Sequence, residues 1–339
     1  MPLVAHNNLP SFERLRAEGR TVLEPGRAQT QEIREMHIGL LNMMPDKALE
    51  ATERQFLRLI GESNQIAQFY VHIFTLPELE RAADAQAYID EHYVSFEDLK
   101  AQGLDALIIT GANVSQPDLT KEPFWKPLQE VMDWAWHSVT STICSCLATH
   151  AVMQFKYGQA REHRGDKLWG VYKHRVLDRS HPLVKGMNTV FDVPHSRFNR
   201  ITEAQFTESG LKTLAAGETS GVHMAVSPDG FRLVCFQGHP EYDTISLHKE
   251  YKREMKRFAA GELDTKPPYP EHYYSGSLVA QLDAGKDDSS FDDLLENTWR
   301  DSARTVIGNW IGQVYQVTNV DRSKQFMDGV DPNDPLNLK

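Results

Sequence analysis

The stretch ICSCLATHAVMQFKYG, residues 143–158, changes from an apolar strand pattern to a helical pattern directly after Cys146. Cys144 lies inside the strand pattern, where a free cysteine usually packs as a small apolar residue. Cys146 is the last residue before the helix, whose N-terminus favours a reactive thiolate and offers free N–H groups to an oxyanion. We therefore predict that Cys146 is a nucleophile, with an inert role in the core as the alternative.

Strand and helix patterns alternate before this stretch. Continuous apolar runs of strand length occupy 36–44, 68–74 and 105–112, and helical spacing follows over 47–61, ending at Gly61, and from residue 123 onward. Alternating buried strands and amphipathic helices are typical of a parallel sheet with helices on both faces. We therefore predict an α/β fold with a mostly parallel sheet flanked by helices.

The second half of the chain is richer in β-structure. The turn sequence SPDG, residues 227–230, predicts a hairpin between two strand patterns. In this half, strand patterns lie within 167–176, 189–197, 222–228 and 231–242, and helical patterns within 245–258 and 303–315.

Both ends of the chain are polar and weakly patterned. We expect residues 1–34 to form an irregular N-terminal arm and residues 319–339 to form a loose C-terminal tail. Residues 35–318 then make up a single domain.

Composition restricts the class of protein. The 339 residues are 40% hydrophobic and carry a formal net charge of -11, which is ordinary for a globular protein and unfavourable for binding nucleic acid. No apolar run approaches the ~20 residues that span a membrane, and no secretory signal is visible. Three cysteines without disulfide or zinc spacing indicate free thiols, a cytoplasmic location and no metal site.

A cysteine nucleophile needs a base, and QGHPEYD, residues 237–243, offers one. This segment follows the strand pattern FRLVCF, so His239 lies at a strand end with Glu241 two residues further on. A carboxylate beside an imidazole fixes its tautomer and supports its protonated form. We predict that His239 is the base and Glu241 its partner, although most of the 14 histidines fit ordinary surface or core positions.

Small residues end the strand pattern DALIIT. Thr110, Gly111 and Ala112 would let backbone N–H groups approach a substrate carbonyl, although an ordinary loop between a strand and a helix fits the same residues.

Basic residues are candidates for binding an anionic substrate. In VPHSR, residues 193–197, a hydroxyl and a guanidinium lie together and are suited to an amino-acid carboxylate. A solvated arginine on a loop is the alternative. From the pattern alone, Lys47, Lys167 and Arg253 cannot be distinguished from surface charges.

A strand–cysteine–helix turn followed about ninety residues later by His-Pro-Glu resembles the class I glutamine amidotransferase fold, which has a flavodoxin-like, three-layer arrangement. More specifically, the chain resembles the homoserine O-acyltransferase family, also called homoserine trans-succinylases. The resemblance covers nearly everything from about residue 11 to 320. It is carried by the stretches SFERLRAEG, QEIREMHIGLLNMMPDKALEATERQFLRLIG, LDALIITGANVS, VTSTICSCLATHA, KLWGVYKHRV, VPHSRFNRI, QGHPEYDTISLHKEYKRE and NTWRDSARTVIGNWIGQVYQ.

The resemblance implies transfer of an acyl group from an acyl-coenzyme A to the hydroxyl of L-homoserine, a step of methionine synthesis. It implies ping-pong kinetics, a homodimer and no permanently bound cofactor. In this sequence Cys146 would form the acyl-thioester, His239 would be the general base and Glu241 would orient it. The oxyanion would be held by backbone N–H groups of Gly111, Ala112 and Leu147, and the amino-acid substrate by Lys47, Lys167, Ser196, Arg197 and Arg253.

The sequence departs from the family's pattern near the nucleophile. Leu147 and Ala148 replace a Trp followed by Gly or Ala, Asn113 replaces Pro, and His150 replaces Gln. At the position that separates acyl donors, glutamate goes with acetyl-CoA and glycine with succinyl-CoA. Here Ser115 is small and uncharged, so it should not repel a succinyl carboxylate, and succinyl-CoA is the expected donor.

Other functions remain open at this point. Acetyl transfer, or acylation of L-serine, would use the same residues, because one methylene changes binding by only about 1–3 kcal/mol. Glutamine amidotransfer is disfavoured because no synthetase domain accompanies the fold. A non-catalytic module that binds CoA or an amino acid is the alternative from a different class, and it would keep ligand binding without Cys146.

Overall fold

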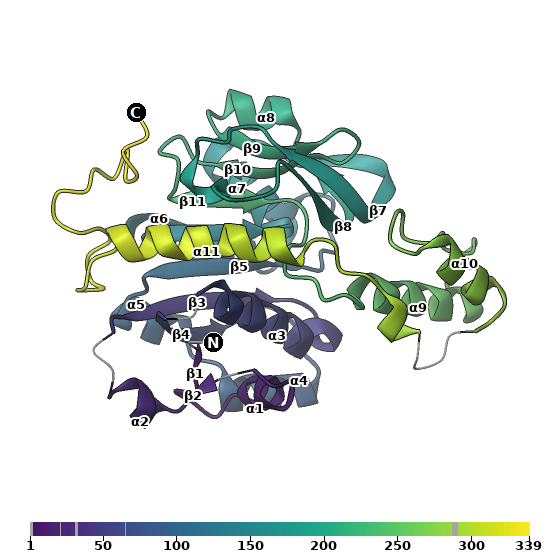
Figure 1. Ribbon diagram of the computed structural model, residues 1–339, viewed down its shortest axis with the longest axis horizontal. Helices are drawn as coiled ribbons and strands as arrows, with labels where there is room; N and C mark the ends of the chain where they lie inside the picture. The colour runs from purple at the N-terminus through teal and green to yellow at the C-terminus, as the bar shows by residue number, and fades with distance from the viewer. Residues whose placement is uncertain (1–2, 21, 31–32, 65, 287–290) are drawn as a thin grey trace.

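The computed structural model describes residues 3–20, 22–30, 33–64, 66–286 and 291–339. These residues form an 11-stranded sheet in the order β2-β1-β4-β3-β5-β6-β11-β10-β9-β7-β8 (Figure 1). The strands are β1 (Leu3–Val4), β2 (Val22–Leu23), β3 (Glu35–Met43), β4 (Gln68–Phe74), β5 (Ala106–Ala112), β6 (Ser141–Ser145), β7 (Glu162–Val176), β8 (Val190–Arg200), β9 (Lys212–Gly217), β10 (Gly221–Val226) and β11 (Leu233–Phe236).

The sheet has a parallel part and an antiparallel part. Every pairing from β2 to β11 in the sheet order is parallel. β4 and β6 are buried along their whole length, because helices cover both faces of parallel strands. β10, β9, β7 and β8 then continue the sheet through antiparallel pairs. The expected α/β fold with a mostly parallel sheet is confirmed.

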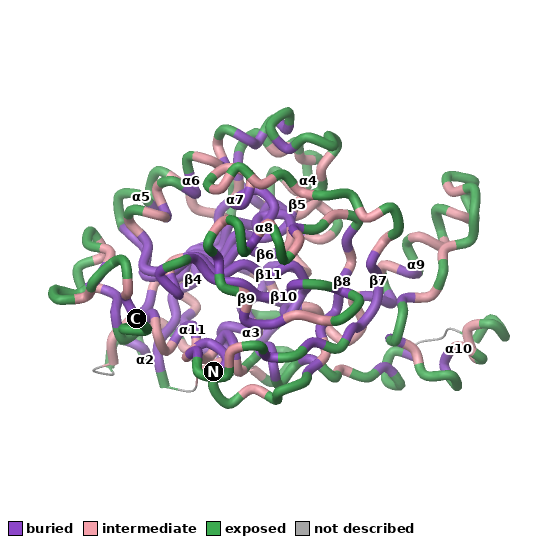
Figure 2. Tube along the Cα trace, turned by 90° about the horizontal axis from the view of Figure 1, so that it is seen from above, coloured by how far each residue is buried: buried purple, intermediate pink, exposed green. Residues whose placement is uncertain are grey.

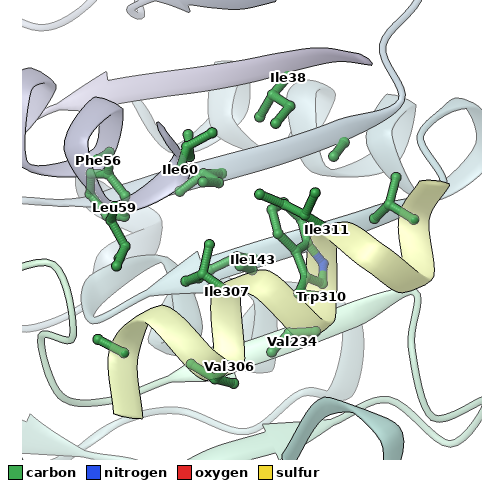
Figure 3. Packing of buried hydrophobic residues seen from close by; sticks show 14 of the residues in the cluster. Ile38, Phe56, Leu59, Ile60, Ile143, Val234, Val306, Ile307, Trp310 and Ile311 are labelled. Atoms are coloured by element: carbon green, nitrogen blue, oxygen red, sulfur yellow. The ribbon is translucent and has the colours of Figure 1, made fainter. Parts of the chain in front are cut away.

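Helices pack on both faces of the sheet and form two large hydrophobic clusters. On one face, α3 and α11 pack on β3, β6 and β11, where Trp310 lies among Ile143, Val234 and Ile307 (Figure 3). On the other face, α6 and α7 pack on β5 and β6. The described helices are α1 (Pro10–Ala17), α2 (Pro25–Ala28), α3 (Asp46–Ser63), α4 (Ala83–His92), α5 (Phe96–Gln102), α6 (Trp125–Ser138), α7 (Leu147–Tyr157), α8 (Glu203–Glu208), α9 (Ser246–Ala259), α10 (Gly276–Asp283) and α11 (Arg300–Val317).

A smaller cluster lies where α9 and α10 project from one end of the sheet (Figure 1). Leu247 and Tyr251 of α9 pack there with Trp169 of β7, so this helix is held against the antiparallel strands. The outer surfaces of α9 and α10 are largely exposed (Figure 2).

The secondary structure expected for the N-terminal arm is wrong. β1 and β2 extend the edge of the sheet in parallel beyond β4, and Phe12 and Leu15 of α1 are buried against the core. The pattern is weak because each strand has only two residues, too few to show a period. The domain boundaries at residues 34 and 318 stay a prediction.

Two further expectations need correction. α3 continues past Gly61 to Ser63, so Gly61 is not its C-cap. The C-terminal segment is not wholly loose, because Phe326 is buried, pairs with Thr318, and is followed by Val330, which packs against the core. By contrast, β4 and the hairpin of β10 and β11 confirm the predicted elements.

Candidate active site

Three neighbouring parallel strands bring the predicted catalytic residues to one edge of the sheet. β6 pairs with β5 on one side and with β11 on the other, with Ser145 opposite Phe236. The backbone N–H of Cys146 donates to the carbonyl of Phe236 at 2.8 Å. Since ligands bind beyond the carboxyl ends of parallel strands, this edge is the candidate site.

Cys146 occupies a sharp turn between β6 and α7. Its φ of 52° and ψ of -107° lie in a region that a residue with a side chain rarely adopts, and it is the N-cap of the helix. Such a turn projects the side chain away from the sheet toward a ligand, as strained backbone at functional sites often does. Cys146 is partly exposed, whereas the other two cysteines are buried.

Cys144 and Cys235 are opposite one another in β6 and β11. Burial raises the pKa of the Cys144 thiol well above its usual value and that of Cys235 to about 12. Both thiols are therefore neutral core groups, and of the three cysteines Cys146 alone combines partial exposure with a position at a helix N-terminus.

His239 follows β11, and one side-chain contact and one backbone hydrogen bond fix its position. Its Nδ1 lies 2.8 Å from Oε1 of Glu241, and its backbone N–H donates to the carbonyl of Pro194 at 2.8 Å. Burial alone would lower the pKa of His239, but the charge of Glu241, the charge of Cys146 and hydrogen bonds to both raise it well above its usual value. These contacts favour the protonated form of His239.

Tyr242 and Glu250 support His239 and were not predicted from the sequence. The ring of Tyr242 stacks on that of His239, with centroids 4.3 Å apart, and its hydroxyl donates to Oε1 of Glu250 at 2.8 Å. Glu250 lies on α9, where it is one of several charged residues at helical spacing, so its sequence position alone gives no signal.

Glu250 also contacts side chains of two strands, β7 and β8. Its Oε2 accepts hydrogen bonds from Ser196 Oγ at 2.6 Å and Trp169 Nε1 at 2.9 Å, and Lys167 Nζ lies 3.5 Å away. Burial alone would raise the pKa of Glu250, but Lys167 and the hydrogen bonds from Ser196 and Tyr242 lower it. The buried carboxylate is therefore ionised, and it holds two of the predicted substrate-binding residues together.

Gly111 faces the nucleophile across the turn. A Cβ built on Gly111 would lie 3.7 Å from Cys146 Cβ and 4.0 Å from the backbone nitrogen of Leu147. Leu147 is the first residue of α7, so its N–H has no partner within the helix. Because Gly111 has no side chain, the space beside the thiol and next to this N–H stays open. Ala112, the next residue, is half-buried.

The remaining predicted substrate-binding residues differ in their surroundings. Arg197 is 4% exposed and points inward, where it donates to His195 Nδ1 and to the carbonyls of Asn199 and Ser220. Arg253 is exposed on α9 beside Glu254. Lys47 is exposed in the first turn of α3.

The residues that depart from the family's pattern surround the same turn. Ser115 and Asn113 are exposed in the loop after β5, and the backbone N–H of Ser115 donates to Glu122 Oε1 at 2.7 Å. Ala148 and His150 are buried in α7. Burial and the charges of Arg197 and Arg161 lower the pKa of His150 to about 3, so this ring is neutral.

The described residues contain neither a cluster of metal-ligating side chains nor a membrane-spanning helix. No group of three or more histidine, cysteine or acidic side chains there could hold a metal ion. No helix in the described part of the chain is long and apolar enough to cross a membrane.

Fold and site together define an α/β protein with a cysteine, a histidine and a glutamate at the carboxyl edge of a parallel sheet. The chain belongs to the homoserine O-succinyltransferase family, whose sequence profile matches residues 2–320.

Close relatives match along their full length. A homoserine O-succinyltransferase of Allochromatium vinosum is 60% identical, with 100% of this chain and 99% of the relative aligned. One from Thioalkalivibrio nitratireducens is 60% identical, with 99% of each chain aligned. One from Thiobacillus denitrificans is 59% identical over 100% of both chains.

Solved structures with a similar arrangement include two glutamine amidotransferases. The protein from Methylobacillus flagellatus has a TM-score of 0.47 and 12% sequence identity, covering 88% of this chain and 99% of that chain. The protein from Thermotoga maritima has a TM-score of 0.43 and 11% identity, covering 83% and 98%.

Proposed function

We propose that this protein is an acyltransferase that moves the succinyl group of succinyl-CoA to the hydroxyl of L-homoserine in methionine biosynthesis, through a thioester on Cys146. The observation that carries the proposal is Cys146 in its strained turn beside the His239–Glu241 pair. Membership of the homoserine O-succinyltransferase family supports the choice of donor and acceptor.

In the first half-reaction the Cys146 thiolate attacks the thioester carbonyl of succinyl-CoA. The negative oxygen of the tetrahedral intermediate accepts hydrogen bonds from the N–H of Leu147 and from the backbone at Gly111 and Ala112. The intermediate collapses, the carbon–sulfur bond to CoA breaks, and the CoA sulfur takes the proton of the His239 imidazolium. The products are CoA and a succinyl-cysteine, with His239 now neutral.

In the second half-reaction neutral His239 takes the proton of the homoserine hydroxyl. The oxygen attacks the succinyl-cysteine, and collapse of this intermediate breaks the carbon–sulfur bond and releases O-succinylhomoserine. The Cys146 thiolate and the His239 imidazolium are restored, and Glu241 stabilises the imidazolium through the contact to Nδ1.

The amino-acid substrate fits the residues around Glu250. Lys167 and Ser196 are held beside this carboxylate, and the charges of Lys167 and Arg253 act on one another. Cationic and hydroxyl groups of this kind bind an α-carboxylate. We assign the homoserine carboxylate to Lys167, Ser196 and Arg253, with Lys47 and Arg197 as further candidates and Ser115 as the position that tolerates the succinyl group.

The proposal includes a homodimer, a cytoplasmic location and acyl-CoA as a co-substrate rather than a bound cofactor. The support for the dimer is the family resemblance alone. Sedimentation of the purified chain would test it, with a mass of twice 38.6 kDa as the expected result.

The test of the proposed function is the intact mass of the protein after mixing with succinyl-CoA or acetyl-CoA and no acceptor. Wild type and Cys144→Ser should each gain one succinyl group, which should leave when homoserine is added. Cys146→Ser should gain no thioester, and Cys144→Ser controls for replacing a neighbouring thiol in the core.

The outcomes separate the alternatives. If only acetyl-CoA forms an adduct, the donor is acetyl-CoA and not succinyl-CoA. If serine rather than homoserine removes the acyl group, the acceptor is serine. No adduct from either donor would contradict an acyltransferase and favour a binding module.

A further inference from the structure

Three arginines, one directly before β7, one on β7 and one on β8, have no carboxylate partner among the described residues. Arg161, Arg164 and Arg197 form no ion pair with any residue that the structure describes, although the chain has 47 acidic residues against 36 Lys and Arg. Arginines that are partly or wholly buried normally pair with an anion, because desolvating an unpaired charge is costly. The positive charge of these three arginines therefore favours the binding of an anionic ligand.

Arg161 is anchored to the loop that follows Gly111. Its Nη2 donates to the carbonyl of Gln116 at 2.9 Å and to that of Pro117 at 3.1 Å. The loop is fixed in turn by Glu122, which accepts from the backbone N–H of Gln116 at 2.6 Å. One end of the loop thus lies against Cys146, through Gly111, and the other end lies against Arg161.

Arg161 retains donors for a ligand. Its Nε is buried without a hydrogen-bond partner among the described residues, and its hydrogen bonds to Gln116 and Pro117 both use Nη2. In Arg197, by contrast, Nε, Nη1 and Nη2 all donate to groups of the protein. Burial lowers the pKa of Arg161, while the charges of Glu122, Cys146 and Asp118 oppose that change. Arg161 thus keeps an unused Nε donor and is freer than Arg197 to bind an anion.

His150 is an independent polar group beside the nucleophile turn that is available to a ligand. It is 2% exposed, and neither ring nitrogen has a partner at hydrogen-bond distance among the described residues, although the Gln237 side chain opposes the lowering of its pKa. The charges of Arg161 and Arg197 both act on it, so it lies among the same cations. A buried polar ring without partners is unusual, and a carboxylate bound between the arginines would give it an acceptor.

We propose that Arg161 binds the terminal carboxylate of the succinyl group while the acyl-thioester forms on Cys146. The inference rests on the proposed function and adds the residue that recognises the donor. The carboxylate is the anionic group of succinyl-CoA nearest to the reacting carbon, only two methylene groups away, whereas the phosphates lie at the far end of the pantetheine arm. The positive charges of Arg164 and Arg197 add to the attraction for this carboxylate.

Butyryl-CoA is the matched probe, because it has the four-carbon acyl chain of succinyl-CoA without the carboxylate. We would measure kcat/KM for both donors in wild type, Arg161→Met, Arg161→Lys and Arg175→Met. Arg175 is exposed on β7, the strand that follows Arg161, and controls for the loss of an arginine. If butyryl-CoA only inhibits, its inhibition constant replaces its kcat/KM in the ratio for every variant.

The ratio of succinyl to butyryl transfer should fall about 10- to 100-fold in Arg161→Met, as expected for losing a charge-assisted hydrogen bond to a carboxylate. It should fall less in Arg161→Lys and stay unchanged in Arg175→Met. The KM for homoserine should change by less than about 2-fold in Arg161→Met, because its carboxylate is bound elsewhere.

Three results would overturn the inference. They are an unchanged ratio in Arg161→Met, an equal loss with both donors, and a loss confined to the KM for homoserine. If wild type still forms a succinyl-cysteine in any of these cases, the proposed function stands and only the role of Arg161 fails. If wild type forms no succinyl-cysteine, both fail.

Discussion

The ring of Tyr242 lies nearly parallel to the ring of His239, with centroids 4.3 Å apart and an interplanar angle of 19°. The hydroxyl of Tyr242 is bound to Glu250, the carboxylate that also holds Ser196. Tyr242 thus connects the imidazole of the proposed catalytic pair to the residues proposed to hold the amino acid. Through this connection, a change at Glu250 can reach the histidine without any direct contact between them.

Tyr242→Phe should keep the stacked ring and lose the hydrogen bond to Glu250. We expect kcat to fall by less than about 10-fold, because one hydrogen bond to a charged group is removed while the position of His239 is retained. Tyr242→Ala should lower kcat further, since the imidazole then loses its packing surface. Steady-state kinetics with both substrates would test this, and equal kcat values for the two variants would contradict a role for the ring.

Glu241→Gln should move the pH dependence of acylation. The charge of Glu241 contributes to raising the pKa of His239, so its removal lowers that pKa. The leaving CoA needs the imidazolium proton, so the alkaline limb of kcat/KM for the acyl donor should shift to lower pH. Rates of thioester formation between pH 6 and 10 would show the shift. An alkaline limb at the wild-type pH would mean that Glu241 does not act on His239.

Glu250→Gln should separate the two half-reactions. The variant keeps an acceptor for Ser196 but loses the charge that pairs with Lys167. We expect the KM for homoserine to rise about 10-fold and thioester formation from succinyl-CoA to change little, since Glu250 contacts the amino-acid side of the site. Exposed Glu208→Gln is a control for the loss of a charge. An equal loss in both half-reactions would argue for a general structural role.

The sequence predicted those parts of the site that are local in the chain. Cys146 is predicted because an apolar strand run and a helical period meet at one residue, and His239 and Glu241 because they lie three and five residues after a strand. Glu250 could not be found in this way. Its partners Lys167 and Ser196 are brought together by the antiparallel pairing of β7 with β8, where Trp169 lies opposite Ser196.

The same reasoning explains why the secondary structure of the N-terminal arm and the role proposed for Arg161 were not predicted from the sequence. Two-residue strands give no period, and their burial follows from pairing with β4, which a local pattern cannot show. Arg161 lies directly before β7 in a polar segment, and its proposed role depends on carbonyls of residues 116 and 117, more than forty positions earlier. Tertiary contacts of this kind leave no periodic signal.

Gly111→Ala should reduce activity without destabilising the fold. The new methyl would lie in ordinary van der Waals contact, 3.7 Å from Cys146 Cβ, but it would occupy the space beside the thiol where the oxyanion forms. We expect kcat/KM to fall about 100-fold and the free energy of unfolding to change by less than about 1 kcal/mol.

Gly238→Ala is the contrasting control, because its methyl would lie 2.5 Å from Val193 Cγ1 and 2.8 Å from His195 Nε2. This crowding should cost about 1–3 kcal/mol of stability. Urea unfolding of both glycine variants, together with thioester formation, would separate the two effects. A Gly111→Ala variant with wild-type activity would exclude the oxyanion role of this loop.

Acid should destabilise the fold through buried histidines at the sheet edge. Burial and the charges of His6 and His37 lower the pKa of His72 to about 3, and His37 Nδ1 lies 2.9 Å from His72 Nε2. Below pH 6.5 the unfolded chain takes up a proton at His72 that the folded chain does not, so the free energy of unfolding falls as the pH drops toward 3. Between pH 6.5 and 5 this one residue accounts for about 2 kcal/mol.

His72→Gln should therefore lose less stability than wild type between pH 7 and pH 5, since the variant has no proton to exclude at this position. The exposed His137→Gln variant is the matched control and should follow the wild-type curve. Denaturant unfolding at several pH values would measure the difference. Parallel curves for wild type and His72→Gln would show that His72 takes up a proton in the folded state without opposition, contrary to its burial against β3 and its neighbours.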